Sequence, residues 1–224
     1  QSRGLGDVYK RQESLPAEKR SKTGVWATFR SFGIIVHNRR YMLYVFQLAF
    51  AQGILFAYIA SSPFIIQQHY GFSPFAFSIC FAVNAVAIGV AAALSVKFRR
   101  TENGTLTGCV GMLVFAVLQM AALYSGCGFW TYELLMFALL FMMGLTFTAS
   151  TTLAMDCERR YAGAASALLG ALCFASGGIV SPLVGLGDIL ISTGVTFVIC
   201  AVCSLLCALW AVKRTGPKVA LCRI

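Results

Sequence analysis

The chain has 224 residues, of which 58% are hydrophobic and only 12% are charged, and its formal net charge is +10. Soluble domains average about 45–50% apolar and about 25% charged residues, so this composition excludes an ordinary soluble protein and indicates an integral membrane protein. The positive charge does not indicate nucleic-acid binding, because the Lys and Arg residues fall in the gaps between long apolar runs.

The chain opens with QSRGLGDVYKRQ and has no methionine before Met42. One codon choice for DVYKRQ, residues 7–12, resembles the mosaic end of a transposase-based sequencing adapter. We therefore interpret residues 1–12 as translated adapter, to be set aside before fold reasoning as an engineered scar would be. The alternative is an ordinary polar, basic segment. The adapter interpretation predicts that the remainder is the downstream part of a longer gene.

Residues 13–41 form a polar lead that carries several Lys and Arg residues. Within this lead, the stretch TGVWATFRSFGIIVHNRRY, residues 23–41, places apolar residues at helical spacing beside basic ones. That pattern predicts an amphipathic helix that lies along the inner membrane surface. The alternative is a solvated linker with anchoring arginines.

Six apolar runs follow, each long enough for the roughly 20 residues that a helix needs to cross a bilayer. Lipid offers no hydrogen-bond partners to a peptide backbone, so each run is expected to be an α-helix. The predicted fold class is therefore an all-α membrane protein with six transmembrane helices. The predicted spans are residues 42–66, 75–96, 106–124, 129–153, 162–186 and 189–212.

The connectors between these runs alternate in charge. Lys and Arg stand before the first run and after the second, fourth and sixth runs, and they are absent from the other three connectors. Short cytoplasmic loops retain Lys and Arg, so we predict that the lead and the basic tail, residues 213–224, both lie in the cytoplasm. The alternation also supports six spans, because one missed or invented span would break it.

Polar side chains inside the spans carry the most information, since they are costly in hydrocarbon and tend to face an interior or a cavity. In the first span, Gln47, Ile54 and Tyr58 share one helical face. Asn84 lies at the middle of the second span, and Glu133 is the only carboxylate in any predicted span. Asn84 fits either a bond between helices or a substrate contact. Glu133 fits either an ionised interfacial position or a cavity or proton role.

No catalytic constellation is apparent in the sequence. His37 and His69 lie in connectors predicted on opposite sides of the membrane, and there is no phosphate loop, His-Glu-x-x-His or Gly-x-Ser-x-Gly motif. The cysteines lie mostly in apolar runs, lack zinc spacing and are expected to pack as small hydrophobes. We therefore predict that the chain is not an enzyme and expect neither a cofactor nor a metal site.

The stretch FAYIASSPFIIQQHYGFSPFAFSICFAVNAV, residues 56–86, resembles the seventh-to-eighth helix region of major facilitator superfamily drug/proton antiporters, most closely the bicyclomycin-resistance (Bcr/CflA) type. AMD at residues 154–156 and AGAASALLG at 162–170 resemble the beginning of that family's helix eleven, and the likeness runs over residues 28–212. Pro–Asn, frequent late in the family's helix ten, is replaced by Thr148–Ala149, a departure that bears on the substrate. The matching residues in the first stretch are Phe56, Ala57, Tyr58, Ser62, Pro63, Phe64, Gly71, Ser73 and Asn84.

The superfamily has two six-helix halves around a central cavity, and this chain resembles only the second, C-terminal half. The resemblance implies that residues 13–41 are the central cytoplasmic loop and that the family's proton-coupling carboxylates lie in the absent half. The expected function is a proton-coupled exporter of drugs or other small molecules in the bacterial inner membrane. Its expected partners are membrane lipid, the missing N-terminal half, a small organic substrate and protons, and no nucleic acid.

The resemblance also implies that the first and fourth spans line the cavity, which Asn84 of the second span would join. Candidate residues in the first span are Gln47, Phe50, Ile54 and Tyr58. In the fourth span, helical spacing selects Glu133, Phe137, Phe141 and Thr148. Two alternatives stay open: a metabolite facilitator of the same superfamily, which would need a more polar cavity, and a complete six-span scaffold or partner-binding protein.

Overall fold

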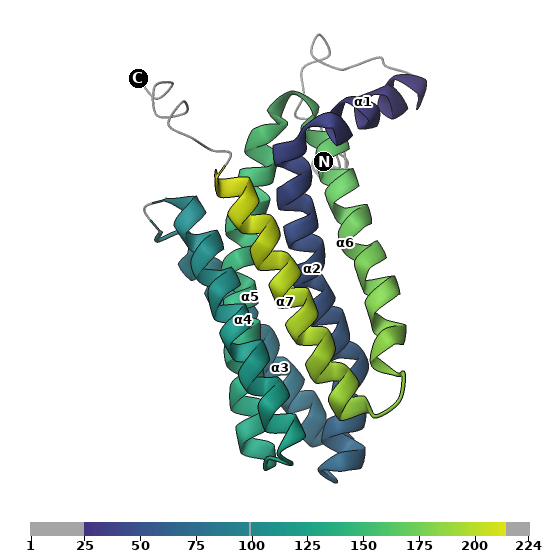
Figure 1. Ribbon diagram of the computed structural model, residues 1–224, viewed down its shortest axis with the longest axis vertical. Helices are drawn as coiled ribbons and strands as arrows, with labels where there is room; N and C mark the ends of the chain where they lie inside the picture. Colours follow the sequence, from purple (N-terminus) through teal and green to yellow (C-terminus); the bar gives the residue numbers. More distant parts are fainter. Residues whose placement is uncertain (1–24, 99, 214–224) are drawn as a thin grey trace, which may run out of the picture.

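The computed structural model of the chain describes residues 25–98 and 100–213, which form helices and the turns between them. Six long helices make an elongated bundle, and a shorter helix, α1, crosses one end of it at a steep angle to α2 (Figure 1). The interpretation of residues 1–12 as adapter concerns residues outside these ranges and stays a prediction.

The helices follow the chain in a simple up-and-down order. Each of the six helices from α2 to α7 is long and apolar enough to cross a membrane, which confirms the predicted all-α membrane fold. The elements are α1 Val25–His37, α2 Arg39–Pro63, the π-helical segment η2 Phe64–His69, α3 Pro74–Ser95, α4 Thr101–Tyr124, α5 Phe129–Cys157, the 3-10 turn η3 Arg159–Tyr161, α6 Ala162–Val184 and α7 Ile189–Lys213.

The two ends of the bundle differ in which connectors they hold. We call the end that carries α1 the α1 end; α2, α4 and α6 begin there. The other end, which we call the distal end, holds the α2–α3, α4–α5 and α6–α7 connectors. Tyr70 ties two of these connectors together, because its hydroxyl donates to the carbonyl of Cys127 at 3.0 Å. Burial, together with the bond to Cys127, raises the pKa of Tyr70.

Short polar side chains define where three of the helices begin. The side chain of Asn38 accepts from the backbone N–H of Arg40 and caps α2. Ser73 caps α3, and Pro74 follows at the first helical position, where its missing N–H costs nothing. Asp188 accepts from the N–H of Leu190 at 2.8 Å at the start of α7. These caps satisfy donors that would otherwise lack partners at a helix start.

Several helix ends differ from the predicted spans. α4 begins at Thr101 rather than at residue 106, and α5 runs to Cys157 rather than to residue 153. Polar residues extend a helix beyond the apolar run, and hydropathy alone does not detect that extension. Pro63 has no N–H to donate, and the helix continues beyond it in π geometry as far as His69, a change that no hydropathy pattern predicts.

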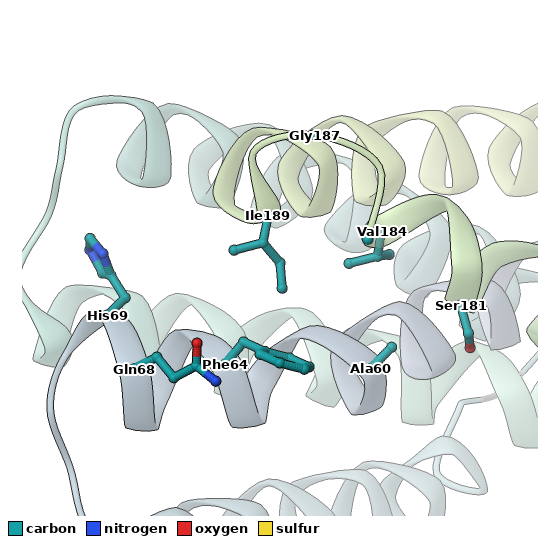
Figure 2. A pocket seen from close by; sticks show the side chains of 9 residues that line it. Ala60, Phe64, Gln68, His69, Ser181, Val184, Gly187 and Ile189 are labelled. Atoms are coloured by element: carbon teal, nitrogen blue, oxygen red, sulfur yellow. The ribbon is translucent and has the colours of Figure 1, made fainter.

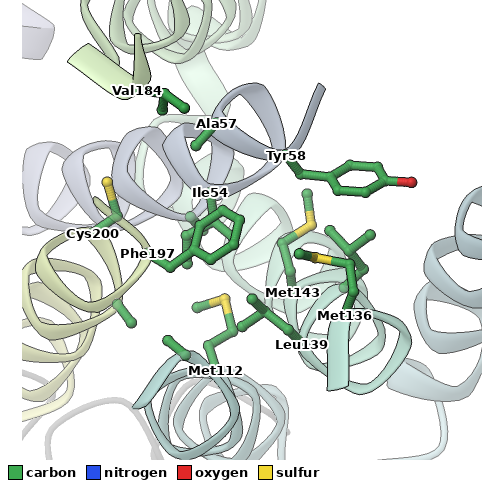
Figure 3. Packing of buried hydrophobic residues seen from close by; sticks show 14 of the residues in the cluster. Ile54, Ala57, Tyr58, Met112, Met136, Leu139, Met143, Val184, Phe197 and Cys200 are labelled. Atoms are coloured by element: carbon green, nitrogen blue, oxygen red, sulfur yellow. The ribbon is translucent and has the colours of Figure 1, made fainter. Parts of the chain in front are cut away.

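Helix α2 lies at the centre of the packing. It contacts α5, α6 and α7, while α5 also packs against α3 and α4, and α4 against α7. Met112, Leu139 and Phe197 converge on Ile54 in the main apolar cluster (Figure 3). The flanking helices α3 and α6 bury the smallest share of their side chains, which leaves the face that they border the least covered part of the bundle.

Candidate functional site

Three of the residues selected from the sequence meet between α2, α3 and α5. The Asn84 Nδ2 amide donates to the Tyr58 hydroxyl at 3.1 Å and to Glu133 Oε1 at 2.8 Å. Asn84 is fully buried although most of α3 is exposed. The amide therefore joins three helices through two hydrogen bonds, and we call these three residues the polar cluster.

The polar cluster leaves two acceptor atoms unused. Glu133 Oε2 and Asn84 Oδ1 are both buried, and neither has a hydrogen-bond partner among the residues that the structure describes. A carboxylate only accepts unless it is protonated, so it orients the Asn84 amide with its N–H groups inward. The unpartnered atoms of the cluster are therefore two acceptors, one on the amide and one on the carboxyl group, while the Tyr58 hydroxyl keeps its hydrogen to donate.

Aromatic rings border the polar cluster on the α3 side. The Tyr58 ring lies nearly parallel to that of Phe81, with centroids 5.8 Å apart and an interplanar angle of 10°. Phe77 adjoins Phe81 at 5.9 Å. Figure 3 shows the Tyr58 side chain pointing away from the apolar cluster around Ile54. The cluster is therefore flanked by rings on which a planar ligand can stack.

The residues selected on α5 share one face of that helix, as their spacing predicts. All four are only partly buried: Glu133, Phe137, Phe141 and Thr148. The opposite face carries Met136, Leu139, Leu140 and Met143, which are buried. The first set therefore forms a half-exposed strip with the carboxylate near its distal end, and we call it the α5 strip.

Two selected residues of α2 lie apart from the polar cluster. Ile54 is fully buried in the apolar core. The Gln47 amide donates to Ser204 Oγ of α7 at 3.1 Å, and Ser204 in turn donates to the Gln47 carbonyl at 3.1 Å. Neither side chain is bonded to the polar cluster, so the proposed site is built without them, and their selection from the sequence stays an untested prediction. Phe50 is partly exposed and stays in the proposed site.

Gln47 belongs to a second polar network that joins four helices. Its amide also lies 3.5 Å from Cys109 Sγ of α4. The Thr146 hydroxyl of α5 donates to the Thr105 carbonyl of α4 at 3.2 Å. The hydroxyl groups of Thr105 and Ser150 are hydrogen-bonded to each other at 3.1 Å. Such bonds between helices hold a bundle together in lipid. Within the described ranges, no group of His, Cys, Asp and Glu is placed to hold a metal ion.

Sequence reasoning missed the two phenylalanines of α3. Phe77, Phe81 and Asn84 stand at spacings of four and three residues, so they lie on one helical face. Because Asn84 was already a candidate, this spacing could have identified both phenylalanines as candidate site residues from the sequence. Phe81 is also 37% exposed, which leaves part of its ring free for contact.

A separate hollow lies at the distal end, with a volume of about 690 Å³ (Figure 2). Phe64, Gln68 and His69 border it on one side, and Ser181 and Ile189 on the other. The π-helical turn after Pro63 brings Gln68 and His69 to its rim. This hollow does not include any residue of the polar cluster.

The family model for the Major Facilitator Superfamily matches residues 8–182, more than three-quarters of the chain. The chain belongs to this superfamily. An uncharacterized MFS-type transporter, YdgK, of Bacillus subtilis strain 168 is 35% identical over 181 residues, a match that takes in 79% of this chain and 45% of that protein. The chain thus spans less than half the length of the curated relative that it matches.

Membership confirms the superfamily part of the resemblance and the prediction that the chain is not an enzyme. Six membrane-spanning helices are consistent with half of a major facilitator fold, which has two six-helix halves. The match to the family model begins at residue 8, inside the stretch of residues 1–12 that we interpreted as translated adapter.

Proposed function

We propose that the chain is the C-terminal half of a secondary active exporter of small, amphipathic organic compounds, of the bicyclomycin-resistance type. The observation that carries the proposal is the convergence of Tyr58, Asn84 and Glu133 beside a partly exposed aromatic face. These side chains come from three separate helices. In a transporter family, such a convergence of polar groups between spans is the default candidate for a substrate path.

The α5 strip supplies the surface on which a substrate would lie. Phe137 and Phe141 offer aromatic area, and only Glu133 and Thr148 are polar. A mostly apolar wall with a few placed polar groups is typical of sites for drug-sized molecules. In the whole protein the missing N-terminal half would close the cavity over this strip, and rocking of one half against the other would alternate access.

The charge at the two ends supports the proposed orientation. Among the described residues, Arg39, Arg40, Lys97 and Arg159 lie at the α1 end, and the distal connectors at 70–73, 125–128 and 185–188 hold no Lys or Arg. By the positive-inside rule the α1 end faces the cytoplasm. Helix α1 would then lie along the inner surface of the bacterial plasma membrane as the last part of the central loop.

The proposal is tested on the full-length gene, recovered by reading the source DNA upstream. Tyr58→Ala and Asn84→Ala each remove one side of the polar cluster and are expected to lower drug resistance about tenfold, because a ligand then loses a buried partner. Gln68→Ala, at the distal hollow, is the control and should leave resistance unchanged. Drug-susceptibility assays at matched expression give the result.

Two outcomes would contradict this proposal. A stop codon followed by a genuine translation start just before Glu13 would make the chain complete and remove the missing half. Unchanged resistance in both Tyr58→Ala and Asn84→Ala would remove these residues from the substrate path.

A further inference from the structure

We propose that the polar cluster selects aromatic organic cations, with Glu133 as the group that binds the positive charge. This inference rests on the proposed transport function and names the substrate class of the same site. It follows from the two acceptor atoms that the cluster leaves without partners.

The cluster leaves two acceptor atoms without partners, and its one remaining donor is the hydrogen of the Tyr58 hydroxyl, which accepts from Asn84. Both N–H groups of the Asn84 amide are already used, one on Tyr58 and one on Glu133. Asn84 Oδ1 and Glu133 Oε2 are left buried with no partner in the described part of the chain. A ligand that brings N–H donors satisfies both atoms, whereas a ligand that brings only acceptors satisfies neither.

Glu133 also has no positively charged partner among the described residues. The ion pairs found among the described residues are Arg40–Glu102 and Arg159–Asp156, both at the α1 end. Glu133 lies in the second turn of α5, toward the distal end, where the described connectors hold no Lys or Arg. A buried carboxyl group either takes up a proton or is stabilised in its charged form by a positive partner. An ammonium, amidinium or protonated heteroaromatic amine provides both that charge and the donors.

The rings around the cluster favour a cation that is also aromatic. Phe81 stacks on Tyr58 and is partly exposed. Phe137 and Phe141 continue along the α5 strip from Glu133. Aromatic faces attract cations through their quadrupole and stack with planar ligands. An anionic acid in the same place would meet two unpartnered acceptors and the carboxyl group of Glu133, with the Tyr58 hydroxyl as its one donor.

The test compares two planar three-ring dyes on the full-length protein in detergent. Proflavine is a cation with N–H donors, and acridone is neutral. We expect Glu133→Gln, which keeps the shape and removes the charge, to weaken proflavine binding about tenfold or more, as loss of a charged hydrogen bond would. Acridone binding should stay within about twofold, because stacking is untouched, and this retention shows that the variant is folded.

The matched control is Asp188→Asn. It removes a carboxylate at the same end of the bundle but retains an N-cap for α7, since Asn caps as well as Asp. We expect it to bind both dyes as the wild type does. If Glu133→Gln binds proflavine as tightly as the wild type does, the cation inference is overturned.

A second measurement needs no variant. A hydrophobic carbodiimide labels buried carboxyl groups, and mass spectrometry measures its attachment to Glu133. We expect proflavine to protect Glu133 and acridone not to, while labelling of Glu102 is the same throughout. Equal labelling of Glu133 with and without proflavine would overturn the inference.

The two levels of the proposal fail in different ways. If the wild type binds acridone but not proflavine, the substrate class is wrong and the transport function stands. If the wild type binds neither dye and confers no resistance to any drug of a broad panel, the proposed function itself fails.

Discussion

At the residue scale, Gln47 and Asn84, two of the three fully buried amides among the described residues, have different surroundings. The Gln47 amide nitrogen donates to Ser204, which donates back to the Gln47 backbone carbonyl, within the network that joins α2, α4, α5 and α7. Asn84 is bonded to Tyr58 and Glu133. Each of the two amides keeps a buried oxygen without a partner among the described residues, so the difference lies in their neighbours. From the sequence alone both are amides in apolar spans, and only their neighbours separate a structural amide from a candidate ligand contact.

This difference predicts the effect of Gln47→Leu. The change breaks the bonds to Ser204 and Cys109, and it should destabilise the folded protein by about 1 kcal/mol, the scale of hydrogen bonds between membrane helices. Dye binding should be unchanged once the protein is folded. Thermal unfolding of the detergent-solubilised protein measures the first effect, and Gln68→Leu at the rim of the distal hollow is the control. A variant of normal stability with weakened dye binding would return Gln47 to the site.

At the scale of the elements, the contact between α3 and α5 positions the polar cluster. A Cβ added at Gly144 of α5 would stand 2.6 Å from the carbonyl oxygen of Ile88 and 2.9 Å from the Cβ of Ala91, both on α3. Backbone atoms cannot move aside as a side chain can, so the absence of a side chain at Gly144 lets α3 approach. That approach carries Asn84 to Glu133.

Gly144→Ala should therefore act on the site at a distance. It pushes α3 away from α5, so we expect weaker proflavine binding and a loss of stability of about 1–3 kcal/mol, as for overpacking. Gly89→Ala is the matched control on α3, because an added Cβ there meets nothing within 4 Å. Dye titration and thermal unfolding are measured together. Wild-type behaviour of Gly144→Ala in both would show that the close contact does not position Asn84.

The sequence predicts the spans well and their contacts poorly. Hydropathy and charge alternation predict six helices in order, because a helix in lipid must satisfy its own backbone. They do not predict that Asn84 meets Glu133, since that meeting depends on how α3 crosses α5 at Gly144. They also do not predict that Ile54 packs in the apolar core, because a period of 3.6 residues shows which side chains share a face but not which neighbouring helix covers that face.

At the scale of the whole molecule, the proposed orientation makes a prediction about access. Cysteines introduced at Ser125, in a distal connector, and at Asp156, at the α1 end, are exposed positions on opposite ends. In a background with the native cysteines replaced, a membrane-impermeant maleimide should label Ser125→Cys in intact cells. It should label Asp156→Cys only after the membrane is opened, because the proposed orientation places that end, with its Lys and Arg residues, in the cytoplasm. The reverse pattern would invert the proposed topology.

The two hydrogen bonds that Asn84 donates have a consequence for motion as well as for recognition. One amide holds α2 through Tyr58 and α5 through Glu133 at the same time. A bound cation that draws the carboxylate toward itself would disturb these hydrogen bonds. Binding of the substrate would therefore be coupled directly to the relative positions of α2, α3 and α5. Substrate binding and helix movement would then need no further residues to couple them.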